Sequence, residues 1–291
     1  MKTINRLFIP EDFIYYRTGS KVFYEYYKKY SKFLIEKINN GYEFIKIIKF
    51  FKFPIRFVVA EKTDIEPNKE FIKSIGIKHG IIHWAPFRKI EKPKGWLKIP
   101  TFITKDILHS SRSAFCVLDK SDYWNKWSPK ARGHRRKILD LKEKGILKIT
   151  KCEDLNIFLN IYSTISIKDP NHKRLIKWCN RSFSDPIIKE NLRVYVVYIN
   201  EKILAGAVFI DEGKTSEYFT SFYTEESKPY HLGIAIMDEW FSSSYEKGIK
   251  YLDLDHMQDY GQLSSYAGYT KFKESIADYD VYFHDMWVKF F

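Results

Sequence analysis

The order of strands and helices predicted after residue 144 is the feature that most constrains the fold of this chain. Short apolar runs rich in Val, Ile, Tyr and Phe predict strands, and longer amphipathic segments predict helices. The predicted order is strand 145–151, helices 153–166 and 171–183, strands 193–200, 203–213 and 214–226, helix 231–248, strand 249–257, helix 268–276 and strand 280–290. A three-strand meander followed by strands that alternate with helices predicts an α/β (α+β) fold. Its mixed sheet is flanked by helices, unlike a doubly wound nucleotide-binding fold.

A basic helix is predicted directly before this series, over residues 128–144. Ser128 can cap its first turn, Pro129 suits the first helical position, and Gly145 ends it. One buried stripe is formed by Trp127, Ala131, His134, Ile138 and Leu141. Arg132 and Arg136 lie on the opposite side, one turn apart. They are either a solvated face or a contact with phosphate groups.

The N-terminal third predicts a more mixed set of elements. They are helix 20–41, strand 55–62, helix 67–76, strands 80–87 and 113–119, and a loop rich in Pro and Lys at 89–102. Residues 44–53 read as a helix, because their lysines recur every three residues among Phe and Ile. Such a segment is either a mostly buried helix whose lysines reach outward or a basic amphipathic helix on an anionic membrane.

The amino-acid composition and length indicate which partners the protein binds and how many units it forms. The 291 residues carry a net charge of +13, which favours polyanionic partners such as RNA, phosphorylated substrates or an anionic membrane surface. Lysine is spread along the chain beside many Ile, Asn, Phe and Tyr, as an AT-rich genome would also give. A cluster of Arg residues is therefore a better indicator of a polyanion-binding site than the net charge is. A chain of this length is expected to form two units, which we place at 1–120 and 121–291.

The three cysteines predict neither a disulfide framework nor a metal site. Cys116, Cys152 and Cys179 are widely spaced and form no CxxC pair. Cys116 and Cys179 lie on apolar faces and are expected to be buried thiols. With no signal peptide and no apolar run of about 18 residues, we expect a cytoplasmic protein, or one that works peripherally at the inner membrane face.

Three stretches together resemble the GNAT acyltransferase superfamily, over about residues 115–285. They are "YWNKWSPKARGHRRKI", "ILAGAVFIDEGKTSEYFTSFY" and "GIKYLDLDHM" followed by "GYTKFKESI". The basic segment is similar to a W-x-x-x-x-x-K-x-R-x-x-x-R-K pattern, and the last stretch to a Gly-x-x-x-Phe-Lys element. The likeness points to the Fem-type branch (FemAB- and FemX-like peptidyltransferases) or to the BioF2-like acetyltransferases.

This resemblance implies an acyltransferase with two GNAT-like units. The first unit, 1–120, is degenerate, and the last strand of 121–291 can pack on it. The implied donor is an aminoacyl-tRNA, with acyl-CoA as the alternative, and no cofactor or metal is resident. The implied acceptor is an amine on a UDP-linked or lipid-linked murein precursor, which connects the protein to peptidoglycan biosynthesis. The third interpretation is a catalytically inactive module of the same fold that binds RNA or a membrane.

The donor-binding loop departs from the pattern of the CoA-dependent enzymes. Those enzymes carry Arg/Gln-x-x-Gly-x-Gly/Ala before their long helix, where backbone amides hold the pyrophosphate. Here the residues are "YHLGIA": Gly233 and Ala235 fit, but Tyr230 replaces the basic or amide residue. This departure favours aminoacyl-tRNA over CoA. Phe272 joins Gly233 and Ala235 as a packing or stacking surface for the donor.

Acyl transfer to an amine needs a neutral nucleophile and stabilisation of the oxyanion that forms. We expect the centre where strand 214–226 and strand 249–257 splay apart, with Tyr223 and Asp255 beside it. Asp255 is either a base, a grip on the acceptor's ammonium, or a structural carboxylate. The resemblance gives Lys273 a role in stabilising the transferring carboxyl or the tRNA end, from an exposed helix position. Lys271 is its register alternative.

The same resemblance gives the two arginines of the basic helix a role. Arg132 and Arg136 are implied to grip the acceptor's pyrophosphate, because Arg side chains bind phosphate in a bidentate fashion.

Overall fold

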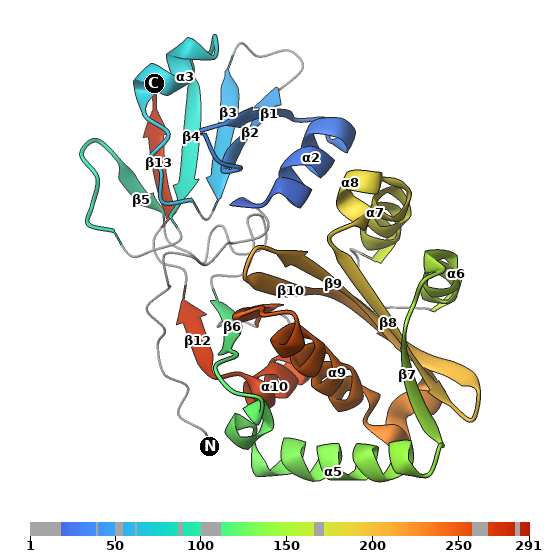
Figure 1. Cartoon of the computed structure of the whole chain (residues 1–291). Helices are drawn as coiled ribbons and strands as arrows, with labels where there is room; N and C mark the ends of the chain where they lie inside the picture. Colours follow the sequence, from blue (N-terminus) through green and yellow to red (C-terminus); the bar gives the residue numbers. More distant parts are fainter. Residues whose placement is uncertain are drawn as a thin grey trace. The chain divides into compact units, whose positions relative to one another are not determined.

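The chain folds into two units, which are described separately (Figure 1). The computed structural model describes residues 19–38, 40–49, 55–61, 63–86, 90–99, 112–165, 172–257, 267–282 and 286–291. Within that part of the chain, the larger unit comprises residues 114–255 and 268–280, and the smaller unit comprises residues 6–113, 256–267 and 281–291. The sequence boundary at 120/121 lies a few residues beyond this division.

The larger unit is built on a seven-stranded sheet, which is mixed as predicted. Its strands in spatial order are β12 (Tyr279–Tyr282), β6 (Arg112–Val117), β11 (Tyr251–His256), β10 (Thr215–Tyr223), β9 (Lys202–Glu212), β8 (Leu192–Ile199) and β7 (Leu147–Lys151). Neighbours from β7 to β10 pair antiparallel, as a meander requires, whereas β10 and β11 pair parallel. The parallel pair is possible because a helix connects the two strands.

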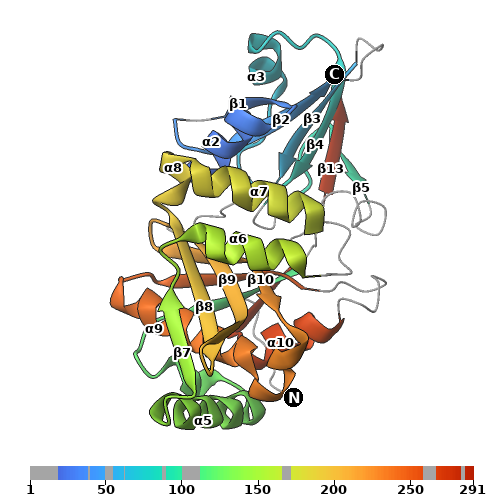
Figure 2. The ribbon, with the colours of Figure 1, turned by 90° about the vertical axis from the view of Figure 1, so that its right-hand side faces the viewer.

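Helices cover both faces of this sheet (Figures 1 and 2). On one face lies α9 (Leu232–Glu246), whose Trp240 stacks on Phe209 with ring centroids 4.6 Å apart. On the other face lies α6 (Leu155–Thr164), followed by α7 (His172–Ser184) and the short α8 (Pro186–Lys189). Gly206 allows α6 to approach, since a Cβ there would lie 3.0 Å from the Phe158 ring and 2.7 Å from Phe222.

The basic helix α5 (Pro129–Glu143) begins and ends as its sequence predicts. Ser128 Oγ accepts from the Ala131 N–H, Pro129 is the first residue, and Gly145 adopts φ 70° directly after the helix. Trp127, Ala131 and Ile138 are buried, but His134 and Leu141 are only half-buried, so the predicted stripe is narrower than expected.

A buried carboxylate fastens α5 to α9. The Arg135 Nε lies 2.5 Å from Asp238 Oδ1, and Tyr123 Oη, from the 3₁₀ helix Tyr123–Lys126, donates to the same carboxylate at 2.8 Å.

The smaller unit has a six-stranded sheet that draws strands from both ends of the chain. In spatial order they are β1 (Leu34–Lys37), β2 (Phe44–Lys49), β3 (Arg56–Glu61), β4 (Gly80–Ala85), β13 (Met286–Phe290) and β5 (Leu97–Ile99). Among the described residues of this unit, two segments are helical, α2 (Lys21–Tyr30) and α3 (Lys69–Ser74). Its core includes Trp84 and Trp96, whose centroids lie 5.3 Å apart, and Trp287 of β13. The last strand is therefore a member of the N-terminal sheet.

Two helix predictions in the smaller unit were wrong. The helix from residue 20 ends at Tyr30, where the Ser31 N–H bonds to the Tyr27 carbonyl, and the chain then enters β1. Residues 44–49 form β2, not a helix, and residues 50–53 lie outside the described part. Lys46 pairs with Glu61 of β3 at 3.4 Å. The amphipathic helix on which the membrane reading rested is therefore not formed by residues 44–49.

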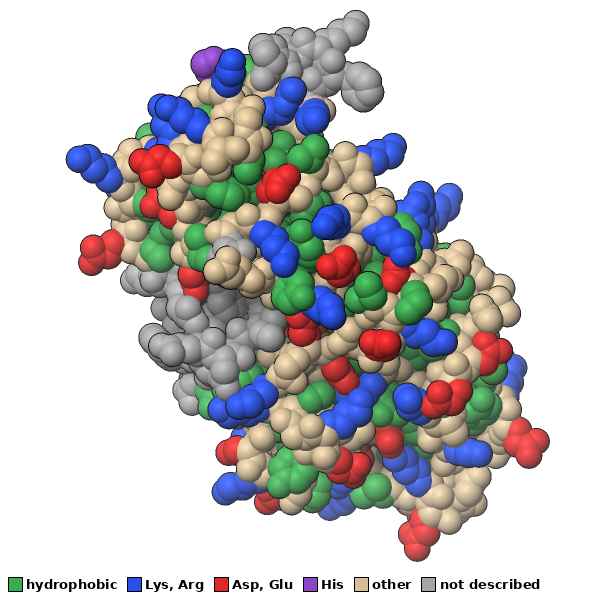
Figure 3. All heavy atoms as spheres, turned by 45° about the horizontal axis from the view of Figure 1, so that its top comes forward, with side chains coloured by type: hydrophobic (Ala, Val, Ile, Leu, Met, Phe, Trp, Pro, Cys, Tyr) green, Lys and Arg blue, Asp and Glu red, His purple; other side chains and the backbone are tan. Residues whose placement is uncertain are grey.

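The structure also shows where the cysteines and the charged side chains lie. Cys116 and Cys179 are buried free thiols, as expected. Lys and Arg side chains on the face shown in Figure 3 are scattered among Asp and Glu. In the described ranges, every helix is too short or too polar to cross a membrane.

Candidate active site

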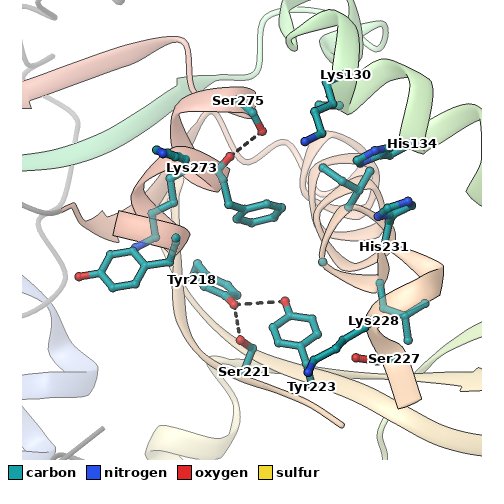
Figure 4. A pocket seen from close by; sticks show the side chains of 18 residues that line it. Lys130, His134, Tyr218, Ser221, Tyr223, Ser227, Lys228, His231, Lys273 and Ser275 are labelled. Carbon is teal, nitrogen blue, oxygen red and sulfur yellow. Dashed lines mark hydrogen bonds between the residues drawn. The ribbon is translucent and has the colours of Figure 1, made fainter. Parts of the chain in front are cut away.

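A pocket of about 620 Å³ opens within the larger unit, among α5, α9, β10 and α10 (Ala267–Ile276). Figure 4 shows its walls: Lys130 and His134 come from α5, Tyr218, Ser221 and Tyr223 from β10, His231 from the start of α9, and Lys273 from α10. Further lining residues include Ser227, Lys228, Gly233, Tyr269, Lys271 and Phe272. The pocket thus gathers side chains from positions 130 to 275 of the sequence.

One wall of the pocket forms where two parallel strands part. β10 and β11 pair from Thr215/Tyr251 to Glu217/Asp253, whereas β10 continues to Tyr223 with β9 as its partner. A splay between these two strands was predicted from the sequence.

The part of β10 beyond the splay carries three hydroxyl groups into the pocket. Tyr218 Oη donates to Ser221 Oγ, and the Oη atoms of Tyr218 and Tyr223 lie 3.5 Å apart (Figure 4). Removal from water, together with nearby Tyr223, raises the pKa of Tyr218 well above its usual value. Tyr218 is therefore protonated at neutral pH and can donate a hydrogen bond but cannot take up a proton.

The first turn of α9 faces the pocket without a side-chain cap. Its N-cap residue His231 adopts the left-handed conformation at φ 54°, and its side chain makes no cap hydrogen bond. The first amides of a helix have no partner within the helix, so those of Leu232 and Gly233 point toward any anion bound there. A Cβ on Gly233 would lie 3.3 Å from the Phe272 ring and 3.6 Å from Tyr223 Oη. This position is therefore closely packed from the pocket side.

Lys273 is buried, not exposed as predicted. Its side chain keeps 5% of its surface accessible, and its Nζ lies 4.9 Å from the centre of the Tyr269 ring and 6.0 Å from that of Tyr218. Two aromatic faces thus favour its charge by cation–π attraction. The sequence missed this burial because the Tyr218 ring comes from a strand more than fifty residues earlier.

Several lysines line the pocket, and its described lining residues include no carboxylate. Lys130, Lys228, Lys271 and Lys273 all contribute to its walls, and no Asp or Glu is among the described residues that line it. The exposed Lys228 pairs with Glu225, outside the lining. This arrangement suits a ligand that carries negative charge or develops it.

Two histidines stack face to face on one side of the pocket. The rings of His134 and His231 lie 3.7 Å apart at an angle of 4° (Figure 4). Partial burial lowers the pKa of both imidazoles, and the Lys130 and Lys137 ammonium groups act in the same direction. Both rings are therefore neutral at pH 7.

Four of the eight predicted site residues line this pocket together: Tyr223, Gly233, Phe272 and Lys273. The other four do not. Asp255 is buried at the end of β11 with φ 63°, and its N–H donates to Asp253 Oδ1 at 2.8 Å. Ala235 is fully buried inside α9, and Arg132 and Arg136 are exposed on α5.

Sequence reasoning missed His134, His231 and Tyr218. His134 was assigned to the buried stripe of α5, since helical spacing gives the direction of a side chain but not whether core or pocket lies there. His231 stands two residues before Gly233 in "YHLGIA", and this proximity was the available signal. Lys130 likewise belongs to the basic segment that drew attention to Arg132 and Arg136.

Comparison with known proteins agrees with the geometry. The family model "Acetyltransferase (GNAT) domain" matches residues 130–273, which include every lining residue named here. A search with the whole chain finds no curated protein of significant sequence similarity.

Solved structures share the fold over most of the chain. FemX has a TM-score of 0.67 at 13% identity, covering 94% of this chain and 91% of FemX. L-PGS from Bacillus licheniformis has a TM-score of 0.54 at 14% identity, with 94% and 92% covered. The C-terminal domain of a putative lysylphosphatidylglycerol synthetase from Agrobacterium fabrum has a TM-score of 0.51 at 11% identity, with 88% and 84% covered. Residues 130–273 therefore match the GNAT acetyltransferase family, which makes this chain an acyltransferase, and most of the chain shares the fold of FemX.

Proposed function

We propose that the protein transfers an aminoacyl group from an aminoacyl-tRNA to an amine of a phosphate-bearing acceptor, a precursor of the cell-wall peptide. The observation that carries this proposal is the pocket itself, which has four lysines and no carboxylate among its described lining. An acceptor linked to UDP or to a lipid diphosphate supplies the matching negative charge. The lysylphosphatidylglycerol synthetase of similar fold is also named for a phosphate-bearing product.

The donor's reactive carbonyl would lie between the start of α9 and Lys273. The uncapped amides of Leu232 and Gly233 offer hydrogen-bond donors on one side, and the buried Lys273 ammonium offers a cation on the other. A low-dielectric wall strengthens such a cation toward a developing oxyanion. Phe272, which packs against Gly233, would hold the donor between them.

The reaction that fits is attack of a neutral amine on the donor's ester carbonyl. A C–N bond forms as the amine nitrogen adds, and the carbonyl oxygen becomes an oxyanion that Lys273 stabilises. The C–O bond to the tRNA ribose then breaks, and the departing oxygen takes the proton that the attacking nitrogen loses. Tyr218 and Tyr223, with hydroxyls on the β10 wall, would orient the carbonyl by hydrogen bonding.

Acyl-CoA is the alternative donor, and the start of α9 favours it. Gly233 and its uncapped amides keep the form that a CoA pyrophosphate needs. Tyr230, however, stands where CoA-dependent enzymes place a basic or amide side chain, which weakens a grip on the pyrophosphate.

We also propose that Arg132 and Arg136 bind phosphate groups. Both are exposed on the helix that contributes Lys130 and His134 to the pocket. At 100° per residue, they point to the side of α5 away from Lys130. A phosphate backbone that runs along the outer face of α5 would meet them, whereas a small acceptor inside the pocket would not.

Donor consumption tests the proposal directly. The protein is incubated with an amine acceptor and, separately, with charged tRNA and with acyl-CoA, and acylated product is followed by mass spectrometry. Product from charged tRNA alone supports the proposal, and product from acyl-CoA alone assigns the alternative donor. Lys273→Met serves as the inactive control, because it removes the charge and retains the volume. A wild-type protein that consumes neither donor contradicts both assignments.

A further inference from the structure

The pocket contains a candidate proton acceptor that the proposed function leaves unassigned. An acceptor amine reaches the site as an ammonium ion that loses one proton to water, and its nitrogen must lose a second proton as it forms the amide bond. The lysines that line the pocket are donors only, and the raised pKa values of Tyr218 and Tyr223 keep both hydroxyls protonated. Among the described lining residues, only His134 and His231 can accept a proton.

We propose that His231, stacked on His134, takes the proton from the acceptor's amine during transfer. This inference rests on the proposed function and adds the group that completes its chemistry. His231 immediately precedes the α9 turn expected to hold the donor and lines the same pocket, so its ring would lie beside the reacting groups. His134 acts through the stack as a positioning residue.

The stacked geometry allows the His134–His231 pair to hold only one proton at a time. With rings 3.7 Å apart, a second proton would place two like charges in contact. Lys130 and Lys137 of α5 oppose protonation, and the other cations facing the pocket are Lys228 before α9 and Lys271 and Lys273 of α10. A proton taken from the amine is thus released readily.

The backbone of His231 supports a functional role. Its φ of 54° is a conformation that residues with a Cβ rarely adopt, and such positions are frequent in active sites. Neither imidazole makes a hydrogen bond to another described residue, so their ring nitrogens remain available to a substrate.

The proton and electron balance needs only water besides the two substrates, because the ammonium first releases one proton to water and the acceptor reacts as its neutral amine. As the C–N bond forms, the amine gives one proton to a ring nitrogen of His231. As the C–O bond breaks, the departing ribose oxygen takes that proton back, and the imidazole returns to its neutral form. With an acyl-CoA donor, the departing sulfur takes it instead.

His231→Gly tests the proposal, because glycine retains the left-handed backbone and opens a ring-sized space beside His134. We expect kcat to fall by about a hundredfold or more with donor KM little changed, and added imidazole to restore much of it. Wild-type activity should decline at acidic pH with an apparent pKa below 6.5, because protonated imidazole cannot accept a proton. His231→Gly should lose this decline.

Two further variants separate catalysis from structure. His134→Asn, which removes only the stacked neighbour, should shift the acidic decline toward the usual imidazole pKa. His79→Asn changes an exposed histidine of the smaller unit and should leave kcat and the pH profile unchanged. A wild-type kcat in His231→Gly, or a loss that imidazole does not restore with an unchanged pH profile, overturns the inference.

Failure of the proposed role of His231 can be distinguished from failure of the proposed function. If wild-type protein acts on neither donor, the proposed function fails, and NMR titration of the imidazole protons still tests the pair. A coupled uptake of one proton below pH 6.5 supports the pair as a base. Two independent titrations at or above the ordinary imidazole value overturn it.

Discussion

Lys273 shows how much a single side chain depends on neighbours that are remote in sequence. Its place in a Phe-Lys element predicted a role in transfer, and it does line the pocket. Its burial beneath Tyr218 and Tyr269 could not be predicted, because those rings meet it only after strand and helix pack. Asp255 illustrates the converse: alternation along the strand gave it a direction, but the pocket lies elsewhere.

Lys273→Met should separate charge from packing. Met fills a similar volume and suits a buried site, so the unfolding temperature should change little. Loss of the cation near the oxyanion should lower kcat by about 10²–10³-fold. Kinetics and thermal unfolding of the purified variant provide both measurements. A normal kcat, or a larger loss in Lys271→Met, would show that the register of the Phe-Lys element was assigned wrongly.

Gly233 substitutions should weaken donor binding in order of size. A Cβ there meets the far end of the Phe272 ring at 3.3 Å, so Gly233→Ala should raise donor KM a few-fold and Gly233→Val much more. Combining Gly233→Ala with Phe272→Leu should recover part of the loss, since the two sites share one contact. Donor titrations of the four proteins measure this, and an unchanged KM in Gly233→Val would exclude this turn from donor binding.

Local signals predicted the elements well where a helix had its own start and stop. Ser128, Pro129 and Gly145 gave α5 its bounds almost to the residue. The same reasoning failed between residues 31 and 49, where no Gly or Pro separates α2 from β1. There the outcome was decided by the β1–β2–β3 ladder, a non-local pairing that apolar spacing does not reveal.

The exposed arginines on the outer face of α5 are predicted to bind a polyanion. If Arg132 and Arg136 contact tRNA phosphates, replacing either with Ala should weaken donor binding. The slope of log binding constant against log salt should fall by about one unit per lost contact. Donor binding at several salt concentrations measures this slope. A raised acceptor KM with normal donor binding would instead assign the arginines to the acceptor.

At the scale of the whole molecule, β13 (Met286–Phe290) pairs with two strands that precede it by about two hundred residues, β4 and β5. It lies between β4 and β5 and buries Trp287 against the core of the smaller unit. Deleting residues 286–291 should therefore unfold the smaller unit, because an inner strand and a core side chain are lost together. Limited proteolysis and circular dichroism of the truncated protein measure the loss.

A milder change at the same strand provides the control. Trp287→Phe keeps β13 and most of the apolar volume, so it should lower the unfolding temperature by only a few degrees. If the truncated protein resists protease as well as the full chain does, β13 does not support the smaller sheet.

The position of β13 also fixes an order of events during synthesis on the ribosome. The segments of the larger unit, 114–255 and 268–280, are translated before residues 286–290 exist. The larger unit can therefore fold while the smaller one still lacks an inner strand and leaves the edge of β4 open, a state that invites pairing with other nascent chains. The smaller unit thus receives β13 only after the segments of the larger unit have been translated, and until then its unpaired strand edge is a site for aggregation.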